Sequence, residues 1–204
     1  MNVNLKHKVL IVVAHTDDET LGLGGAIARH VENGDQVFAL SMTDGVGSRN
    51  QNKKAEIDKR NKASIKAAKI LGFKWLHSTC FPDNAMDSVP LLEIIRVIES
   101  AKSQIEPTLI YTHSSADLNI DHRLVTQATL TAFRPDDKAH WQEIRAFEIP
   151  SATDFGHKSV TNIFYPNLYI NISELWKKKL SALSVYDEEI HNSPHARSYD
   201  GIEN

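Results

Sequence analysis

The sequence lacks several features that mark special classes of protein. Its 204 residues include one cysteine, Cys80, which excludes an internal disulfide and fits a reducing compartment. No apolar run approaches the roughly 20 residues that a membrane-spanning helix needs. The formal net charge of −3 gives no electrostatic basis for binding nucleic acid or an anionic membrane. We therefore expect a cytoplasmic protein with no membrane span and no nucleic-acid partner.

The sequence also shows no targeting segment, internal repeat or interdomain linker. The first residues, MNVNLKHK, lead directly into an apolar run, which predicts no signal peptide. The composition is that of an ordinary globular protein, with 41% hydrophobic and 24% charged residues. The length suits one domain. We predict a single domain over residues 1–204, with a polar C-terminal tail from about residue 187.

Apolar runs alternate with helical patterns along the chain. Runs rich in β-branched residues predict strands buried on both faces, and apolar positions three and four residues apart predict helices. The predicted strands cover residues 8–15, 36–45, about 73–79, 108–113, 143–150 and 167–173, and the predicted helices cover 19–33, 52–71, 90–104, 121–134 and 173–186. This alternation implies right-handed βαβ units. We predict an α/β, Rossmann-like three-layer fold with a mostly parallel sheet, in which ligands bind beyond the carboxyl ends of the strands.

Ionisable residues gather where the first predicted strand passes into the first helix. His15, Asp17, Asp18 and Glu19 occupy this turn. Carboxylates this close repel one another, and a divalent ion would relieve the repulsion. Zn²⁺ accepts mixed nitrogen and oxygen ligands, and its catalytic sites keep three protein ligands. The alternative is structural, because either aspartate could cap the helix.

A second pair of the same kind follows the predicted strand 108–113. Asp121 and His122 open the next helix, so they are expected at the same edge of the sheet as His15. One such pair at a helix start is usually structural, and Asp121 could also be a cap. Two such clusters at strand-to-helix turns of one parallel sheet favour a metal site.

Both stretches resemble signatures of the LmbE/PIG-L family of zinc-dependent N-acetylglucosaminyl deacetylases. AHTDDETLGLGG (14–25) resembles the first signature, and THSSADLNIDHRLV (112–125) resembles the second. The resemblance spans residues 8 to about 198. It implies a Zn²⁺-dependent hydrolase that removes an acetyl group from an N-acetylated amino sugar, a small molecule that is free or conjugated.

The resemblance implies roles for individual residues. His15, Asp18 and His122 are the expected zinc ligands, and Asp17 is the expected general base. An ion at this site would lower the pKa of water, and Asp17 would accept the proton of that water. Asp121 is expected to orient a histidine or to polarise the site.

Three further residues are candidates for contact with the substrate. Arg60 stands where the family carries a substrate-contacting arginine. Arg49 could bind sugar hydroxyls or phosphate beside it, although a solvated surface arginine is the equal alternative. His113, at the end of a predicted strand, is a candidate proton donor or a residue that supports the ligands.

The chain departs from the family pattern at three positions. Thr16 replaces a proline, Ala63 replaces an acidic residue, and Asn119 stands where several members have a histidine. Asn119 can donate a hydrogen bond to an oxyanion but cannot protonate a leaving amine. The group that protonates the amine stays open between Asp17 and His113.

Two other classes of protein are considered. A nucleotide-binding module would use GLGG (22–25) to cradle phosphates, but the pattern G-x-G-x-x-G is not met and the acidic cluster would repel a pyrophosphate. A non-catalytic homologue that still binds metal is the other class, and the presence of Asp17 argues against it. A neighbouring subunit could complete the pocket, so a homo-oligomer is one expectation.

Overall fold

The computed structural model describes residues 6–48, 53–76, 79–137, 139–156 and 163–203. Within these ranges the strands are β1 (Lys8–Val13), β2 (Gln36–Ser41), β3 (Lys74–Trp75), β4 (Leu109–His113) and β5 (Glu143–Phe147). They form one sheet in the order β3-β2-β1-β4-β5, and every neighbouring pair is parallel. The sheet is therefore parallel throughout, not only for the most part.

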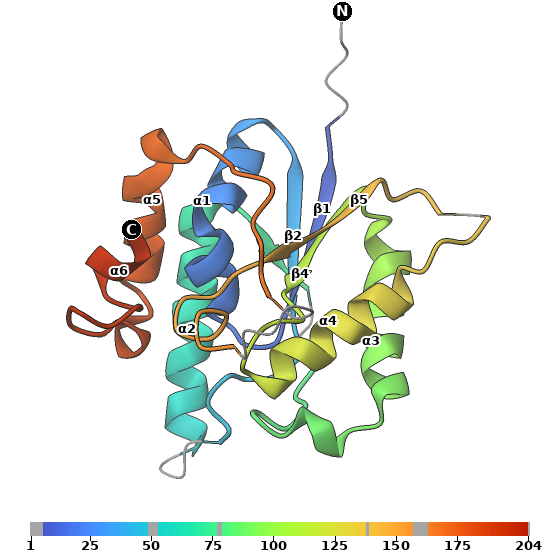
Figure 1. Ribbon diagram of the computed structural model, residues 1–204, viewed down its shortest axis with the longest axis horizontal. Helices are drawn as coiled ribbons and strands as arrows, with labels where there is room; N and C mark the ends of the chain where they lie inside the picture. Colours follow the sequence, from blue (N-terminus) through green and yellow to red (C-terminus); the bar gives the residue numbers. More distant parts are fainter. Residues whose placement is uncertain (1–5, 49–52, 77–78, 138, 157–162, 204) are drawn as a thin grey trace, which may run out of the picture.

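Helices cover both faces of this sheet. The α-helices are α1 (Asp18–Glu32), α2 (Lys53–Leu71), α3 (Leu91–Ile105), α4 (Ile120–Ala132), α5 (Trp176–Leu183) and α6 (Tyr199–Glu203), and the 3₁₀ helices are η1 (Met86–Ser88), η2 (Ser173–Leu175) and η3 (Asp187–Glu189). Figure 1 shows α1, α2 and α5 on one side and α3 and α4 on the other. The predicted α/β, Rossmann-like three-layer fold is confirmed.

The central strand β1 explains why its sequence shows no polar alternation. Val9, Ile11 and Val13 pack in the core under α1, α2 and α5. Leu10 and Val12 point to the other face and pack with α3 and α4. All five side chains are at most 1% exposed. A strand buried on both faces needs apolar residues at every position, as the sequence predicted.

The order in which strands are added to the sheet reverses at β1: β2 and β3 extend the sheet on one side of β1, and β4 and β5 extend it on the other. β1 pairs with β2 on one edge and with β4 on the other. The helix after β1 covers one face, and the helix after β4 covers the opposite face. The two connections therefore diverge at the carboxyl ends of neighbouring strands, which is where such sheets bind ligands. His15 follows β1, and His113 is the last residue of β4.

One predicted strand is wrong. Residues 163–172 are extended but pair with no strand in the described part of the chain. Ile172 instead packs on Gly25 of α1, and the carbonyl oxygen of Asn171 accepts hydrogen bonds from Arg29. The apolar alternation in this segment reflects contacts with a helix and not a ladder.

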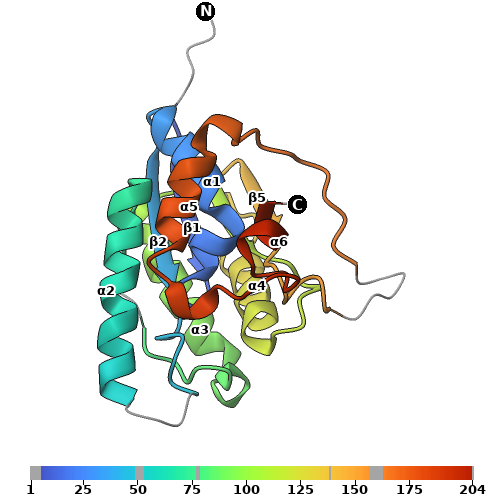
Figure 2. The ribbon, with the colours of Figure 1, turned by 90° about the vertical axis from the view of Figure 1, so that its left-hand side faces the viewer.

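The C-terminal part of the chain adds short helices to the α1 face. The helix predicted over 173–186 begins as η2, and α5 ends at Leu183. Residues from 187, predicted as a polar tail, form η3 and α6 and bury the side chain of Glu189. Figure 2 shows α5 beside α1 and α2. Among the described residues, no helix combines the length and apolarity that crossing a membrane requires.

Candidate metal centre

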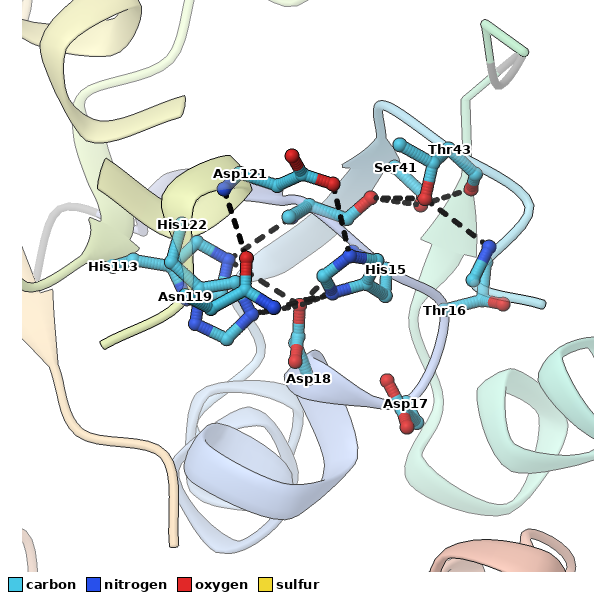
Figure 3. Close-up of polar contacts among 12 residues, drawn as sticks. His15, Thr16, Asp17, Asp18, Ser41, Thr43, His113, Asn119, Asp121 and His122 are labelled. Atoms are coloured by element: carbon cyan, nitrogen blue, oxygen red, sulfur yellow. Dashed lines mark hydrogen bonds and ion pairs between the residues drawn. The ribbon is translucent and has the colours of Figure 1, made fainter. Parts of the chain in front are cut away.

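Three predicted ligands meet at the carboxyl ends of β1 and β4, where Figure 3 shows them pointing toward one another. His15 follows β1, Asp18 begins α1, and His122 lies in the first turn of α4. His15 Nδ1 lies 3.3 Å from Asp18 Oδ2 and 3.2 Å from His122 Nε2. The third separation, between Asp18 Oδ2 and His122 Nε2, is 3.4 Å.

These separations suit donor atoms around one small cation. Tetrahedral donors about 2.0–2.1 Å from Zn²⁺ lie about 3.3 Å from one another. The three residues are at most 7% exposed, so the group is shielded from bulk water. Two imidazole nitrogens and one carboxylate oxygen could therefore hold a zinc ion with a position left open.

The electrostatics of the cluster also favour a cation. Burial alone would raise the pKa of Asp18, but the imidazoles of His122, His113 and His15 hold it well below its usual range. Burial alone would lower the pKa of His122, yet the carboxylates of Asp18 and Asp117 raise it to about 9. The pKa of His15 is raised well above its usual value in the same way, against burial, chiefly by Asp18. The carboxylates therefore stabilise positive charge at the two imidazoles, and a divalent ion bound there would supply the same positive charge.

Hydrogen bonds between neighbouring side chains and the backbone of Ala14 fix the chain just before His15. The hydroxyls of Ser41 and Thr43 donate to the carbonyl oxygen of Ala14 at 3.3 and 3.0 Å. The N–H of Ala14 donates to His113 Nε2 at 2.9 Å. The direction of the His15 side chain is therefore set by β2 and β4 as well as by β1.

Two carboxylates hold the other nitrogen of His15. His15 Nε2 lies 3.3 Å from Asp121 Oδ2 and 3.3 Å from Asp83 Oδ1. Asp121 is fixed in turn by the backbone N–H groups of Asn84 and Met86, at 2.7 and 3.1 Å. A carboxylate on one imidazole nitrogen leaves the other nitrogen free for a metal. Asp121 thus contacts a histidine that is a candidate ligand, and Asp83 is an additional contact that sequence reasoning missed.

Asp117 plays the same part for His122. Asp117 Oδ2 lies 3.0 Å from His122 Nδ1 and accepts a hydrogen bond from Thr153 at 2.9 Å. The other oxygen accepts from the N–H of Asn119 at 2.8 Å. Sequence reasoning missed Asp117 too, although its place five residues before His122 was a usable signal.

His113 packs directly against the ligand group. Its ring stacks on His122, with centroids 3.9 Å apart and planes 8° apart. Burial, with the nearby His122, lowers the pKa of His113 to about 4. Nε2 accepts from Ala14, while Nδ1 is buried without a hydrogen-bond partner among the described residues.

Asp17 lies outside the ligand group (Figure 3). Its Oδ2 is 3.0 Å from Arg60 Nη1, and its buried Oδ1 has no hydrogen-bond partner in the described part of the structure. Burial raises the pKa of Asp17, and the Arg60 guanidinium opposes that shift. The neighbouring carboxylates of Asp17 and Asp18 thus diverge, as expected at the end of a strand. Arg60 is buried, at 4% exposed.

Asn119 is the N-cap of α4. Its Oδ1 accepts from the N–H of Asp121 at 2.8 Å, and its Nδ2 donates to Asn84 Oδ1 at 3.0 Å. The remaining predicted site residue, Arg49, lies outside the described residues. The structure therefore brings together every predicted site residue that it describes. These residues lie where β1 passes into α1, where β4 passes into α4, and in α2.

The comparisons with known proteins agree with this arrangement. Residues 10–133 match the family model described as PIG-L: GlcNAc-PI de-N-acetylase. The chain belongs to this family. The matched range includes both turns that supply the candidate ligands, so the PIG-L assignment rests on the part of the chain that builds the cluster.

Relatives cover most of the chain. It is 29% identical to the uncharacterized deacetylase YaiS of Escherichia coli (strain K12), over 89% of this chain and 91% of that protein. It is 25% identical to the diacetylchitobiose deacetylase of Thermococcus kodakarensis, over 89% and 70%. The crystal structure of GalB, the 4-carboxy-2-hydroxymuconate hydratase of Pseudomonas putida KT2440, shares the fold, with a TM-score of 0.67, 22% identity and coverage of 87% and 78%. The PIG-L fold therefore occurs in deacetylases and in a hydratase.

The glycines of the first PIG-L signature serve helix packing in this structure. GLGG (22–25) lies inside α1, away from its N-terminus. A Cβ on Gly22 would lie 2.5 Å from Phe147 Cδ2 and 2.7 Å from the carbonyl oxygen of Glu148. Gly22 lets α1 approach the end of β5 closely, and Gly25 leaves room for Ile172, so these glycines do not form the phosphate cradle of a nucleotide-binding module.

A cavity of about 710 Å³ lies beside the candidate PIG-L metal centre. It is bounded by α1, the ends of β4 and β5 and the segment 163–172. His113 lines this cavity, and the three candidate ligands do not. The cavity and the cluster therefore meet at the His113 ring.

Proposed function

We propose that the protein is a Zn²⁺-dependent hydrolase that removes the acetyl group from an N-acetylated amino sugar of the N-acetylglucosamine type, free or conjugated. The observation that carries the proposal is the spacing of three donor atoms, 3.2–3.4 Å apart, on His15, Asp18 and His122. Membership of a deacetylase family supports the reaction, and the diacetylchitobiose deacetylase supports the class of substrate.

The ligand residues and their carboxylate partners have a shared task. When bound, the zinc ion would supply Lewis acidity toward the amide carbonyl and toward water. His15, Asp18 and His122 would hold the ion, while Asp121 and Asp117 keep the two imidazole rings in orientation.

Asp17 is the proposed general base. Its Oδ1 carries no hydrogen bond within the described structure, so a lone pair is available to a water molecule. The carboxylate accepts the proton of the attacking water while the new C–O bond forms. The same carboxyl can then return the proton to the nitrogen as the C–N bond breaks. One residue thereby serves as base and then as acid.

Two other residues are proposed to contact the reacting group. His113 Nδ1 is buried without a partner among the described residues, and the residue borders the cavity, so it can bond to a substrate placed there. Asn119 Nδ2 carries two N–H groups; one donates to Asn84 Oδ1, and the other can donate to the oxyanion. Arg49 stays a prediction for substrate binding.

Product analysis tests the proposal. Zinc-loaded protein is incubated separately with N-acetylglucosamine and with N,N′-diacetylchitobiose, and acetate and free amine are measured. We expect equal amounts of both products from at least one sugar, no product after chelation of the metal, and recovery on adding Zn²⁺. A metal-loaded protein that releases acetate from neither sugar would contradict a free N-acetylated sugar as the substrate, and release from no conjugated N-acetylated sugar either would contradict the proposal as a whole.

A further inference from the structure

We propose that Arg60 and the C-terminal segment 186–198 position the general base. A chain of alternating charges runs from the buried Asp17, Arg60 and Glu189 to the partly exposed Arg197. In this proposal, which rests on the proposed role of Asp17, Arg60 is a positioning residue and does not contact the substrate.

Both terminal nitrogens of the Arg60 guanidinium are engaged by the protein. Nη1 donates to the carbonyl oxygen of Thr16 at 2.9 Å and lies 3.0 Å from Asp17 Oδ2. Nη2 pairs with Glu189 Oε1, and the Tyr186 ring lies 5.6 Å below the guanidinium carbon. Because Arg60 is only 4% exposed, little of its guanidinium is open to a sugar.

Glu189 links this group to the rest of the C-terminal segment. Its side chain is buried, and Oε2 lies 3.1 Å from Arg197 Nη1. Arg197 also donates through Nε to the carbonyl oxygen of Pro150 at 3.2 Å and to Ser151 Oγ at 2.8 Å. The segment is thus fastened both to α2 and to the connection after β5.

The division of Arg60 between two carboxylates keeps one oxygen of Asp17 free. Arginine binds a lone carboxylate through two parallel N–H bonds. Glu189 engages Nη2, so Asp17 meets only Nη1 and its Oδ1 stays without a partner among the described residues. Loss of the Glu189 charge would let Arg60 turn both arms toward Asp17. The oxygen that accepts the proton would then be occupied.

The next pair along the same two elements provides a matched control. Lys59 pairs with Glu188, as Arg60 pairs with Glu189, so α2 and η3 are joined by two consecutive ion pairs. The side chains of Lys59 and Glu188 are 53% and 41% exposed. Exposed pairs contribute little to stability, and this one touches no group of the site.

The experiment compares Glu189→Gln with Glu188→Gln in the full-length, zinc-loaded protein, with N,N′-diacetylchitobiose as substrate. We expect Glu189→Gln to lower kcat by about tenfold or more with KM changed by less than about twofold, because ground-state binding is untouched. Zinc content should be unchanged, and Glu188→Gln should behave as wild type. In an Asp17→Asn background, Glu189→Gln should cause no further loss, because both act through one group.

A crystal structure of Glu189→Gln gives a readout that does not depend on turnover. We expect both terminal nitrogens of Arg60, Nη1 and Nη2, to donate hydrogen bonds to the Asp17 carboxylate. Arg60→Lys, which keeps the charge but loses the second arm, should lower kcat and leave KM unchanged; it also serves if Glu189→Gln does not fold.

The proposal is overturned if Asp17 and Arg60 keep their wild-type contact in Glu189→Gln and kcat stays within about twofold of wild type. A raised KM with unchanged kcat in Arg60→Lys would also overturn it and return Arg60 to substrate binding. Wild-type acetate release by Asp17→Asn would instead refute the assigned base, while the crystal structure would still decide the positioning role.

Discussion

Side chains in the site differ in how many of their polar atoms already have a hydrogen-bond or ion-pair partner within the protein. Asp18 Oδ2 accepts from the N–H of His15 at 2.9 Å and faces three imidazoles, so its charge is committed to the ligand group. Asp17 keeps one oxygen without a partner in the described part of the chain. Two adjacent aspartates therefore have different chemical capacities, one for holding a cation and one for accepting a proton.

Replacement of Asp17 by asparagine tests this division. An amide of the same shape cannot accept the proton of water, so we expect kcat for acetate release to fall about 10²–10⁴-fold. Zinc content should stay at the wild-type value, because Asp17 is not a ligand. Steady-state kinetics and metal analysis on one preparation check both expectations. A kcat within a few-fold of wild type would mean that another group is the base.

Asn119 has a structural task that the geometry makes explicit. Its Oδ1 caps the backbone N–H of Asp121, so Asn119→Ala should lower the free energy of unfolding by about 1 kcal/mol. Asn119→Asp keeps the cap but, like the alanine variant, loses the bond from Nδ2 to Asn84 Oδ1, so it should be more stable than Asn119→Ala. Urea denaturation of the three proteins decides this. Equal stability of the alanine variant and wild type would show that the cap contributes nothing.

Lys179 links the stability of the fold to pH. Burial lowers the pKa of this lysine from 10.5 to about 8, and Glu148 opposes the shift. Between pH 8 and 10.5 the unfolded chain therefore binds a proton that the folded chain does not, and stability rises with pH. The rise is on the order of 3 kcal/mol.

The comparison with Lys179→Met isolates this lysine from other groups that titrate in the same range. Unfolding free energies of both proteins are measured at intervals from pH 7 to pH 11. The difference between wild type and variant should change in favour of wild type as pH rises. A difference that does not vary with pH would mean that Lys179 keeps its ordinary pKa when folded.

Helix α1 illustrates how local sequence serves two ends. Its first residue is a candidate metal ligand, and in its second turn Gly22 permits close approach to the end of β5. Alanine is normally better than glycine within a helix, by about 1 kcal/mol. At Gly22 this preference is reversed, because a Cβ would meet the carbonyl oxygen of Glu148 at 2.7 Å.

The two neighbouring glycine positions give a matched pair of variants. Gly22→Ala should lower the free energy of unfolding by about 1–3 kcal/mol, because α1 must move off the sheet. In Gly24→Ala the new Cβ meets Lys179 Cγ at 3.1 Å and Thr20 Cγ2 at 3.7 Å but no backbone atom, so the change should be close to neutral. Thermal unfolding separates them. Equal melting temperatures would contradict the packing role of Gly22.

Elements whose signal is local could be predicted from the sequence. β1 and β4 are apolar runs followed by polar turns, and the helices after them show a clear apolar stripe. The extended segment 163–172 misled the prediction, because its alternation of apolar residues is real while its partner is a helix. Whether an extended segment joins the sheet depends on whether it can reach a free edge strand, and a local sequence pattern does not contain that information.

The topology of the whole molecule determines which residues of the site could be predicted from the sequence. Parallel topology places the turns after β1 and β4 at one edge, so His15 and His122 could be expected together. Glu189 could not, because its contact with Arg60 joins residues 129 positions apart and follows no motif. Asp83 likewise reaches His15 only through the fold. Ligands carried on strand ends are readable from sequence, and the residues that hold them are mostly not.

Zinc content tests the metal centre most directly. Wild type, His122→Ala and the control His191→Ala, which removes an exposed histidine of the C-terminal segment, are purified, loaded with Zn²⁺ and freed of excess metal. Elemental analysis should give one zinc per chain in wild type and in His191→Ala. It should give almost none in His122→Ala, while circular dichroism shows that this variant is folded. A folded His122→Ala protein with the zinc content of wild type would contradict a site built from His15, Asp18 and His122.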